Sequence, residues 1–233
     1  MKPLHLISGG AAQGLVAQLS KRFAAEQGLV PEGTFGAVGL MKDKLLAGAP
    51  CDVIILTAAL IDQLEHEGHV KPGTARPLGV VRTGVAVQAS EPTPVVDTPA
   101  ALAALLRSAQ GIYFPDPVKA TAGIHFMKVL KALGVDQELA GRLRSFPNGA
   151  TAMRELAAAT GRGLVGCTQV TEILYTPGVR LAGVLPSAFE LATVYSAAVC
   201  SSAAEPEAAQ ALVELLSAPD TRGLRAAGGF EDR

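Results

Sequence analysis

Short apolar runs alternate with longer amphipathic stretches along most of this chain. The runs at 3–7, 53–56, 111–114 and 163–167 are bounded by Gly, Pro or polar residues, which is typical of short buried strands. Between them, apolar residues recur at helical spacing, as in Leu15, Val16, Leu19 and Phe23. Strands that alternate with helices predict an α/β fold in which each sheet is mostly parallel and flanked by helices.

Polar residues at the ends of these stretches predict where helices begin. Thr57 is placed to cap a helix that runs to about Glu67, and Thr98-Pro99 combines an N-cap with proline in the first turn. A further helix is expected from Asp136 to about Arg144, with Leu139 and Leu143 on its apolar face.

Two longer strand-like runs, near 78–87 and 191–199, suggest where the chain crosses between two lobes. The expected organisation is a discontinuous first lobe of residues 1–82 and 196–233, with residues 83–195 inserted as a second lobe. The 233 residues suffice for one large or two small domains.

Composition narrows the possible functions. The formal net charge is −1 and no cluster of Lys and Arg is present, so no nucleic-acid partner is expected. No apolar run reaches the roughly 18 residues of a membrane helix, so membrane insertion is not expected either. The first residues enter a strand pattern directly, which predicts a cytoplasmic monomer, or a periplasmic one if a signal peptide was removed from a longer precursor.

Cysteine and histidine do not form a metal-ligand pattern. Cys51, Cys167 and Cys200 are widely spaced and are expected to be reduced, largely buried thiols. His66 and His69 lie three residues apart beside acidic residues, which favours a solvated helix face. Neither a metal nor a cofactor is predicted.

Small-residue loops that lead from strands into helices are the main candidates for a site. Ligands of such sheets bind at the carboxyl ends of strands, and helix N-termini attract anions. The glycines there also have a purely geometric interpretation as turn residues. The candidate ligand-binding residues are Ser8, Gly9, Gly10, Ala11, Ala37, Val38, Gly39, Thr121, Ala122, Gly123, Asn148, Gly149, Ala150, Thr168 and Gln169.

Two motifs resemble those of the molybdate-binding proteins of ABC importers, within the type II periplasmic binding proteins. Residues 47–52, Ala-Gly-Ala-Pro-Cys-Asp, resemble the family's Ala-Gly-Ala-Pro-x-Asp signature, and Asp116-Pro117 with Thr121–Ile124 resembles its Asp-Pro…Pro-Ala-Gly segment. Gly229-Phe230 is similar to the family's tail. This resemblance implies a two-lobed fold that closes on a small anion, with an ABC permease as partner if the protein is exported.

The resemblance is weaker for the ligand itself. Members that take molybdate use two serines and a tyrosine where this chain has Ala11, Val38 or Gly39, and Gly166. Loss of those hydroxyl donors would weaken binding of a buried tetrahedral anion by roughly 1–3 kcal/mol each. A wider site without them favours an organic carboxylate.

The chain also resembles the aconitate isomerases of this fold, which leaves a cytosolic carboxylate isomerase as the alternative function. Such a reaction needs a base near a carbon acid. Lys119, His125 and Cys167 are candidates by position, although each has a structural interpretation as a solvated charge, a packing residue and a buried thiol, respectively.

Overall fold

The computed structural model describes residues 2–232 and consists of two compact units. One unit comprises Met1–Val81 and Thr193–Arg233, and the other comprises Arg82–Ala192. The sequence placed the two boundaries at 82/83 and 195/196. The chain passes from one unit to the other within β4 (Arg76–Gln88) and at the start of β9 (Ala192–Val199).

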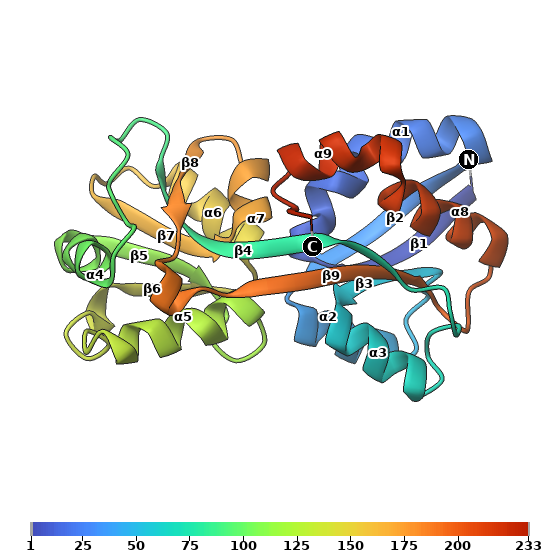
Figure 1. Cartoon of the computed structure of the whole chain (residues 1–233), viewed down its shortest axis with the longest axis horizontal. Helices are drawn as coiled ribbons and strands as arrows, with labels where there is room; N and C mark the ends of the chain where they lie inside the picture. The colour runs from blue at the N-terminus through green and yellow to red at the C-terminus, as the bar shows by residue number, and fades with distance from the viewer. Residues whose placement is uncertain (1, 233) are drawn as a thin grey trace. The chain divides into compact units, whose positions relative to one another are not determined.

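The first unit is built on three parallel strands and one antiparallel strand. β1 pairs with β2 and β3 in parallel, and β9 pairs with β3 in the opposite direction. In Figure 1, α1 and α8 lie on one face of these strands, and α2 and α3 lie on the other. Besides β9 and the first part of β4, its elements are β1 (Lys2–Gly9), η1 (Gly10–Ala12), α1 (Gln13–Gln27), β2 (Leu29–Gly36), α2 (Val38–Leu46), β3 (Val53–Thr57), α3 (Ala58–His66), α8 (Pro206–Ser217), η4 (Pro219–Thr221) and α9 (Arg222–Ala227).

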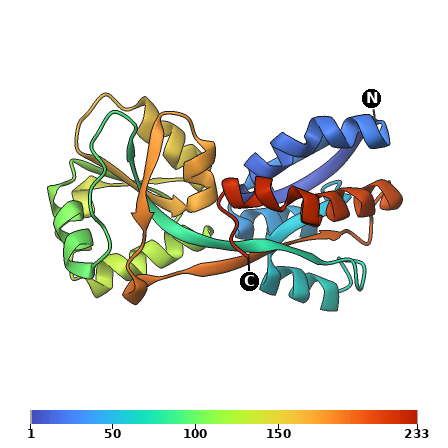
Figure 2. The same ribbon diagram turned by 45° about the horizontal axis from the view of Figure 1, so that its top comes forward.

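The two sequence-distant parts of this unit share one core. Figure 2 shows the C-terminal β9 and α8 beside the N-terminal strands. The core includes Phe23 of α1, Ile54 of β3 and Leu212 of α8, all of which are buried. Residues 1–81 therefore lack part of their own core without the segment that follows residue 192.

The second unit repeats this plan. β5 pairs in parallel with β6 and β7, whereas β4 pairs antiparallel with β7 and β8. Besides the second part of β4, its elements are α4 (Pro99–Ser108), β5 (Gly111–Pro115), α5 (Thr121–Ala132), η2 (Ala140–Arg142), β6 (Leu143–Phe146), α6 (Gly149–Ala158), β7 (Leu164–Gln169), α7 (Val170–Tyr175), β8 (Val179–Val184) and η3 (Ser187–Phe189).

Two separate apolar clusters cover the faces of this second sheet. One joins α4 and α5 to the sheet around Leu106 and Phe126, and the other joins α6 and α7 around Met153 and Ile173. The α/β fold with mostly parallel strands is thus confirmed for each unit.

The helix caps at Thr57 and Thr98 are confirmed, since their hydroxyls accept from the Leu60 and Ala101 N–H groups at 3.4 and 3.1 Å. The helix expected from Asp136 to Arg144 is wrong. That stretch forms turns, the short η2 and then β6, because Leu143 pairs with Ile112 at the edge of the sheet. A strand partner remote in sequence overrides the weak helical spacing of two leucines.

Candidate functional site

The predicted loops around Ser8–Ala11 and Ala37–Gly39 lie at the carboxyl ends of two strands of the first unit's sheet. β1 and β2 run in parallel, with Gly9 opposite Gly36 in register, so the loops that follow them are neighbours. A Cβ atom at Gly9 would lie 2.9 Å from Val38 Cγ1, too close for a side chain. Ser8–Ala11 and Ala37–Gly39 are therefore brought together, as the strand order requires.

These loops offer backbone rather than side-chain donors. Ser8 is fully buried and its hydroxyl donates to the Gly9 carbonyl at 2.8 Å. Ala11, Ala37 and Val38 are buried apolar residues. Helix α2 begins at Val38 without a side-chain cap, so its first N–H groups remain for another acceptor.

The three predicted loops of the second unit also lie together, at the carboxyl ends of three parallel strands. Parallel pairing sets Pro115 opposite Phe146, and Tyr113 opposite Gly166. The loops after β5, β6 and β7 consequently follow the same ends of neighbouring strands, where α/β sheets bind ligands.

The loop from β5 to α5 is held rigidly by its own residues. One carboxylate oxygen of Asp116 accepts from the backbone N–H groups of Val118 and Lys119, at 2.7 and 2.8 Å. A Cβ atom at Gly123 would lie 2.2 Å from the Pro115 carbonyl oxygen, so only glycine allows the first turn of α5 to pack against this loop. Helix α5 begins at Thr121 without a side-chain cap.

The N-terminus of α6 is already occupied by a carboxyl group of this chain, that of Glu172. The Glu172 carboxylate accepts from the Thr168 hydroxyl at 2.6 Å and from the backbone N–H groups of Ala150 and Gln169. Burial raises the pKa of Glu172, and these three hydrogen bonds oppose that rise. A Cβ atom at Gly149 would lie 1.9 Å from the carboxylate, so glycine is required there.

Several predicted ligand residues of the second unit are thus engaged inside the protein. Asn148 caps α6 by accepting from the Thr151 N–H at 2.8 Å, while Ala150 and Thr168 bind Glu172. Glu172 was not among the residues predicted from the sequence. The spacing Gln169-x-x-Glu172, in which a glutamate reaches back to the N–H at the start of its helix, was the available signal.

Gln169 is different, because its side-chain amide has no hydrogen-bond partner among the residues that the structure describes. It is only 3% exposed, yet neither its Nε2 nor its Oε1 forms a hydrogen bond with any residue between 2 and 232. The hydroxyls of Thr83 and Thr171 are in the same condition within that range. Buried polar groups are normally satisfied, and each exception calls for an explanation.

Thr83 and Gln169 are direct neighbours across the β4–β7 ladder. Thr83 uses its backbone N–H and carbonyl to bond Leu191 and Leu185, so the pair is of the non-hydrogen-bonded kind, in which side chains on one face approach most closely. The Gln169 side-chain amide, which can both donate and accept hydrogen bonds, and the Thr83 hydroxyl therefore lie side by side at the end of β7.

The three candidate bases differ in their surroundings. Cys167 is fully buried in the apolar cluster of α4 and α5, and burial raises the pKa of its thiol far above the ordinary value. His125 Nε2 lies 2.8 Å from the Phe189 carbonyl oxygen, so Nε2 is the donor, and in the neutral form of the ring Nδ1 is the acceptor. Lys119 is half-buried, in the loop that Asp116 holds.

The motif at 47–52 is structural. Gly48 has φ of +83° just after α2, where an L side chain would be strained. The buried Asp52 carboxylate accepts from the backbone N–H groups of His5, Ala204 and Glu205, at 2.8, 2.7 and 3.1 Å. It thereby joins β1 to the segment before α8.

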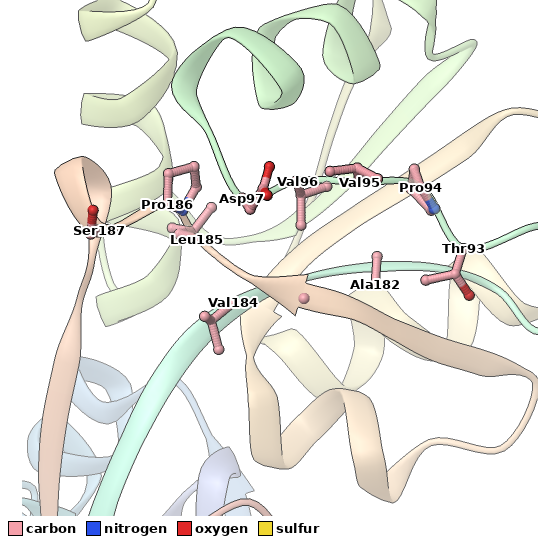
Figure 3. Close-up of a pocket in the computed structure, with 11 residues that line it drawn as sticks. Thr93, Pro94, Val95, Val96, Asp97, Ala182, Val184, Leu185, Pro186 and Ser187 are labelled. Atoms are coloured by element: carbon pink, nitrogen blue, oxygen red, sulfur yellow. The ribbon is translucent and has the colours of Figure 1, made fainter.

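A hollow of about 530 Å³ lies elsewhere in the second unit, between residues 93–97 and 182–187 (Figure 3). Asp97 is the one ionisable side chain among the residues that line it, and its negative charge disfavours an anion. None of the predicted ligand residues lines this hollow.

Across residues 2–232, His, Cys, Asp and Glu do not gather in groups of three or more that could hold a metal ion. In the same range, every helix is too short or too polar to span a bilayer.

Comparison with known proteins identifies the family. Residues 4–231 match the model of bacterial extracellular solute-binding proteins, and the chain belongs to this family. Among characterised relatives, it is 24% identical over 225 residues to an aconitate isomerase from Pseudomonas sp, an alignment that covers 93% of this chain and 83% of that protein.

Solved structures agree on the two-lobed fold of type II periplasmic binding proteins. The periplasmic molybdate-binding protein of Azotobacter vinelandii matches with a TM-score of 0.80 at 20% identity, over 97% of this chain and 98% of that one. The sulfate-binding protein SubI from Mycobacterium tuberculosis H37Rv matches with a TM-score of 0.76 at 18% identity, over 99% and 86% of the two chains.

Proposed function

We propose that this solute-binding protein takes a small organic anion in the periplasm and delivers it to an ABC permease. The family match supports solute binding. The observation that carries the choice of ligand is the buried side-chain amide of Gln169, which lacks a hydrogen-bond partner among residues 2–232.

The chemistry of that amide favours an organic ligand over a simple oxyanion. Nε2 needs an acceptor and Oε1 needs a donor. Sulfate or molybdate supplies acceptors only and would leave Oε1 unsatisfied, which costs about 1–3 kcal/mol. A carboxylate that also carries a hydroxyl satisfies both atoms, and the Thr83 hydroxyl beside them adds a further donor.

The charge of the ligand is matched by backbone donors. In the second unit, helix α5 starts without a side-chain cap, at the strand ends where Gln169 also lies. Its N–H groups and dipole stabilise a negative group without any lysine or arginine. Because Glu172 occupies the α6 N-terminus, we assign Asn148, Gly149 and Ala150 a supporting role and place Gln169 in contact with the ligand.

A thermal-shift panel tests the ligand class. It compares citrate, cis- and trans-aconitate with molybdate, tungstate, sulfate and phosphate. A ligand at 100 times its dissociation constant adds about 2.7 kcal/mol, a shift of several degrees. We expect the largest shift with citrate, which carries a hydroxyl as well as carboxylates, whereas the aconitates, like the oxyanions, offer acceptors only and leave Oε1 unsatisfied; a shift confined to molybdate or tungstate would overturn the proposal.

Substitution of Gln169 tests its role directly. Gln169→Leu should leave the unfolding free energy unchanged or higher, because it removes a buried unsatisfied amide, yet weaken carboxylate binding at least about tenfold in calorimetry. The matched control is Gln88→Leu. The buried Gln88 amide donates to the Leu156 and Ala159 carbonyls, at 3.1 and 2.6 Å, so its loss should destabilise the fold and spare binding.

The reverse pattern, with Gln169→Leu destabilised and carboxylate binding intact, would assign Gln169 to the scaffold.

The alternative function is isomerisation of a small carboxylate, which the 24% identical aconitate isomerase favours. Cys167 is a poor base because its thiol is buried and its pKa is raised. His125 is the better candidate, since the bond to Phe189 leaves Nδ1 to accept a proton. NMR of trans-aconitate with the protein in D₂O distinguishes the two functions: exchange or conversion that His125→Ala abolishes would establish the enzyme, and an unchanged spectrum supports binding alone.

A further inference from the structure

Two of the three cysteines lie in contact in the first unit, although they are 149 positions apart in the chain. The Cys51 and Cys200 sulfur atoms are 3.2 Å apart. Both residues are buried, with exposed fractions of 4% and 0%. Their thiols form a chain of hydrogen bonds in which Cys200 donates to Cys51 Sγ and Cys51 donates to the Val53 carbonyl at 3.1 Å.

The backbone around this pair is fixed by strand pairing. β3 and β9 are antiparallel with Val53 opposite Val199, and the Cys200 N–H donates to the Asp52 carbonyl at 2.9 Å. This register sets Cys200 opposite Asp52, so Cys51 is one position from the residue that is paired with Cys200, and the 3.2 Å between the sulfur atoms shows that the two side chains meet. Neighbouring segments of this kind bring Cα atoms into the range that a disulfide bridges, and side-chain torsion closes the remaining gap between the sulfurs.

We infer that Cys51 and Cys200 form a disulfide when the protein folds in an oxidising compartment, and that this bond ties together the two sequence-distant parts of the first unit. The loop that it closes contains all of the second unit, Arg82–Ala192. Closure of so long a loop removes more entropy from the unfolded chain than closure of a short one.

The reaction is thiol–disulfide exchange with a small-molecule or protein disulfide, such as oxidised glutathione. A thiolate of one cysteine attacks that disulfide, breaks its S–S bond and releases one reduced thiol. The second cysteine then displaces the other thiol from the mixed disulfide. The protein loses two S–H bonds and gains one S–S bond, and the two protons and two electrons pass to the oxidant, which becomes two thiols.

The surroundings indicate when this exchange takes place. The hydrogen bond to Cys51 and burial both raise the pKa of the Cys200 thiol, so the folded pair is neither accessible nor reactive. Exchange is accordingly fastest while the first unit is still open. The chain belongs to an extracellular family, whose members fold where disulfides persist. The inference does not depend on which solute is bound.

The test starts with the wild-type full chain and no variant. The protein is unfolded in reductant, refolded with either reduced or oxidised glutathione, and unfolded again without reductant for thiol counting and intact-mass measurement. After oxidised refolding we expect one free thiol and a mass lower by two hydrogen atoms, against three free thiols after reduced refolding. The oxidised protein should also melt several degrees higher.

Cys167 supplies the matched control, because it is buried in the core of the second unit, whereas Cys51 and Cys200 are buried in the core of the first. Cys167→Ser should show no free thiol after oxidised refolding, whereas Cys51→Ala should retain two. Three free thiols in the oxidised wild type, or peptide mapping that links Cys167 to either partner, would overturn the inference.

Discussion

At the scale of single residues, the second unit is organised around a buried carboxyl. Glu172 is 6% exposed and its carboxylate accepts from Thr168 and from two backbone N–H groups. It thus takes the place that a bound anion would have at the N-terminus of α6. A protein that fills one helix terminus internally leaves fewer donors for its ligand, which raises the importance of Gln169.

The raised pKa of Glu172 predicts how stability changes with pH. A carboxyl whose pKa is higher in the folded state binds more protons folded than unfolded over the window between the two values. Its contribution is therefore fully present below the unfolded pKa, near 4.3, and is lost as pH rises through the folded pKa. Glu172→Gln removes this titration, so the variant should gain stability relative to wild type as pH rises from about 4 to 8.

Thermal melts across that pH range provide the measurement. Glu155→Gln, at an exposed position on α6, is the control and should differ from wild type by a small, nearly constant amount. If Glu172→Gln instead becomes less stable than wild type as pH rises, the hydrogen bonds to the carboxylate outweigh its burial.

At the scale of elements, the position of α5 depends on the absence of a side chain at Gly123. The first turn of α5 packs against the end of β5, with the site of a Gly123 Cβ atom 2.2 and 2.3 Å from the carbonyl oxygens of Pro115 and Asp116. The backbone atoms of a loop held by Asp116 cannot move aside easily. The Ala-Gly of the sequence motif therefore fixes where α5 begins.

Gly123→Ala should lower the unfolding free energy by about 1–3 kcal/mol, as overpacking does elsewhere. The added methyl group should also displace the N-terminus of α5, so carboxylate affinity should fall as well. Gly141→Ala is the control, because its Cβ atom would meet nothing within 4 Å. Urea unfolding of both variants checks this, and equal midpoints would show that the loop adapts.

At the scale of the whole molecule, the two units differ in chain continuity. The second unit is one segment, Arg82–Ala192, with both of its apolar clusters formed by its own residues. The first unit needs residues from both ends of the chain, since Tyr195, Leu212 and Phe230 belong to its core.

We expect residues 82–192 to fold when expressed alone and residues 1–81 to remain unfolded, because only the former keep a complete core. Far-UV circular dichroism should give a cooperative melt for 82–192 and none for 1–81. The two segments 1–81 and 193–233, mixed or joined by a short linker, should recover cooperativity. A cooperative melt of 1–81 alone would contradict this account.

How much of the structure could be predicted from the sequence depended on how far apart in the chain the interacting residues are. The caps at Thr57 and Thr98 act over three residues and were predictable from the chain itself. The strand β6 was not, because its edge pairing with β5 joins Leu143 to Ile112. The candidate loops do lie at strand ends in the structure, and ligand binding by them stays a prediction. The hydrogen bonds of Glu172 could not be read from the sequence because they join two helices and a strand end.

The sequence by itself determined the α/β alternation, the helix starts and the small loops, since periodicity, caps and glycines act locally. Only the tertiary structure decided that Cys51 meets Cys200, that Glu172 occupies the α6 N-terminus and that the Gln169 amide has no hydrogen-bond partner between residues 2 and 232. The physical reason is register: which side chains share an edge of a sheet depends on how strands remote in sequence align. That alignment is fixed by burial of the complete core and is not encoded at any one position.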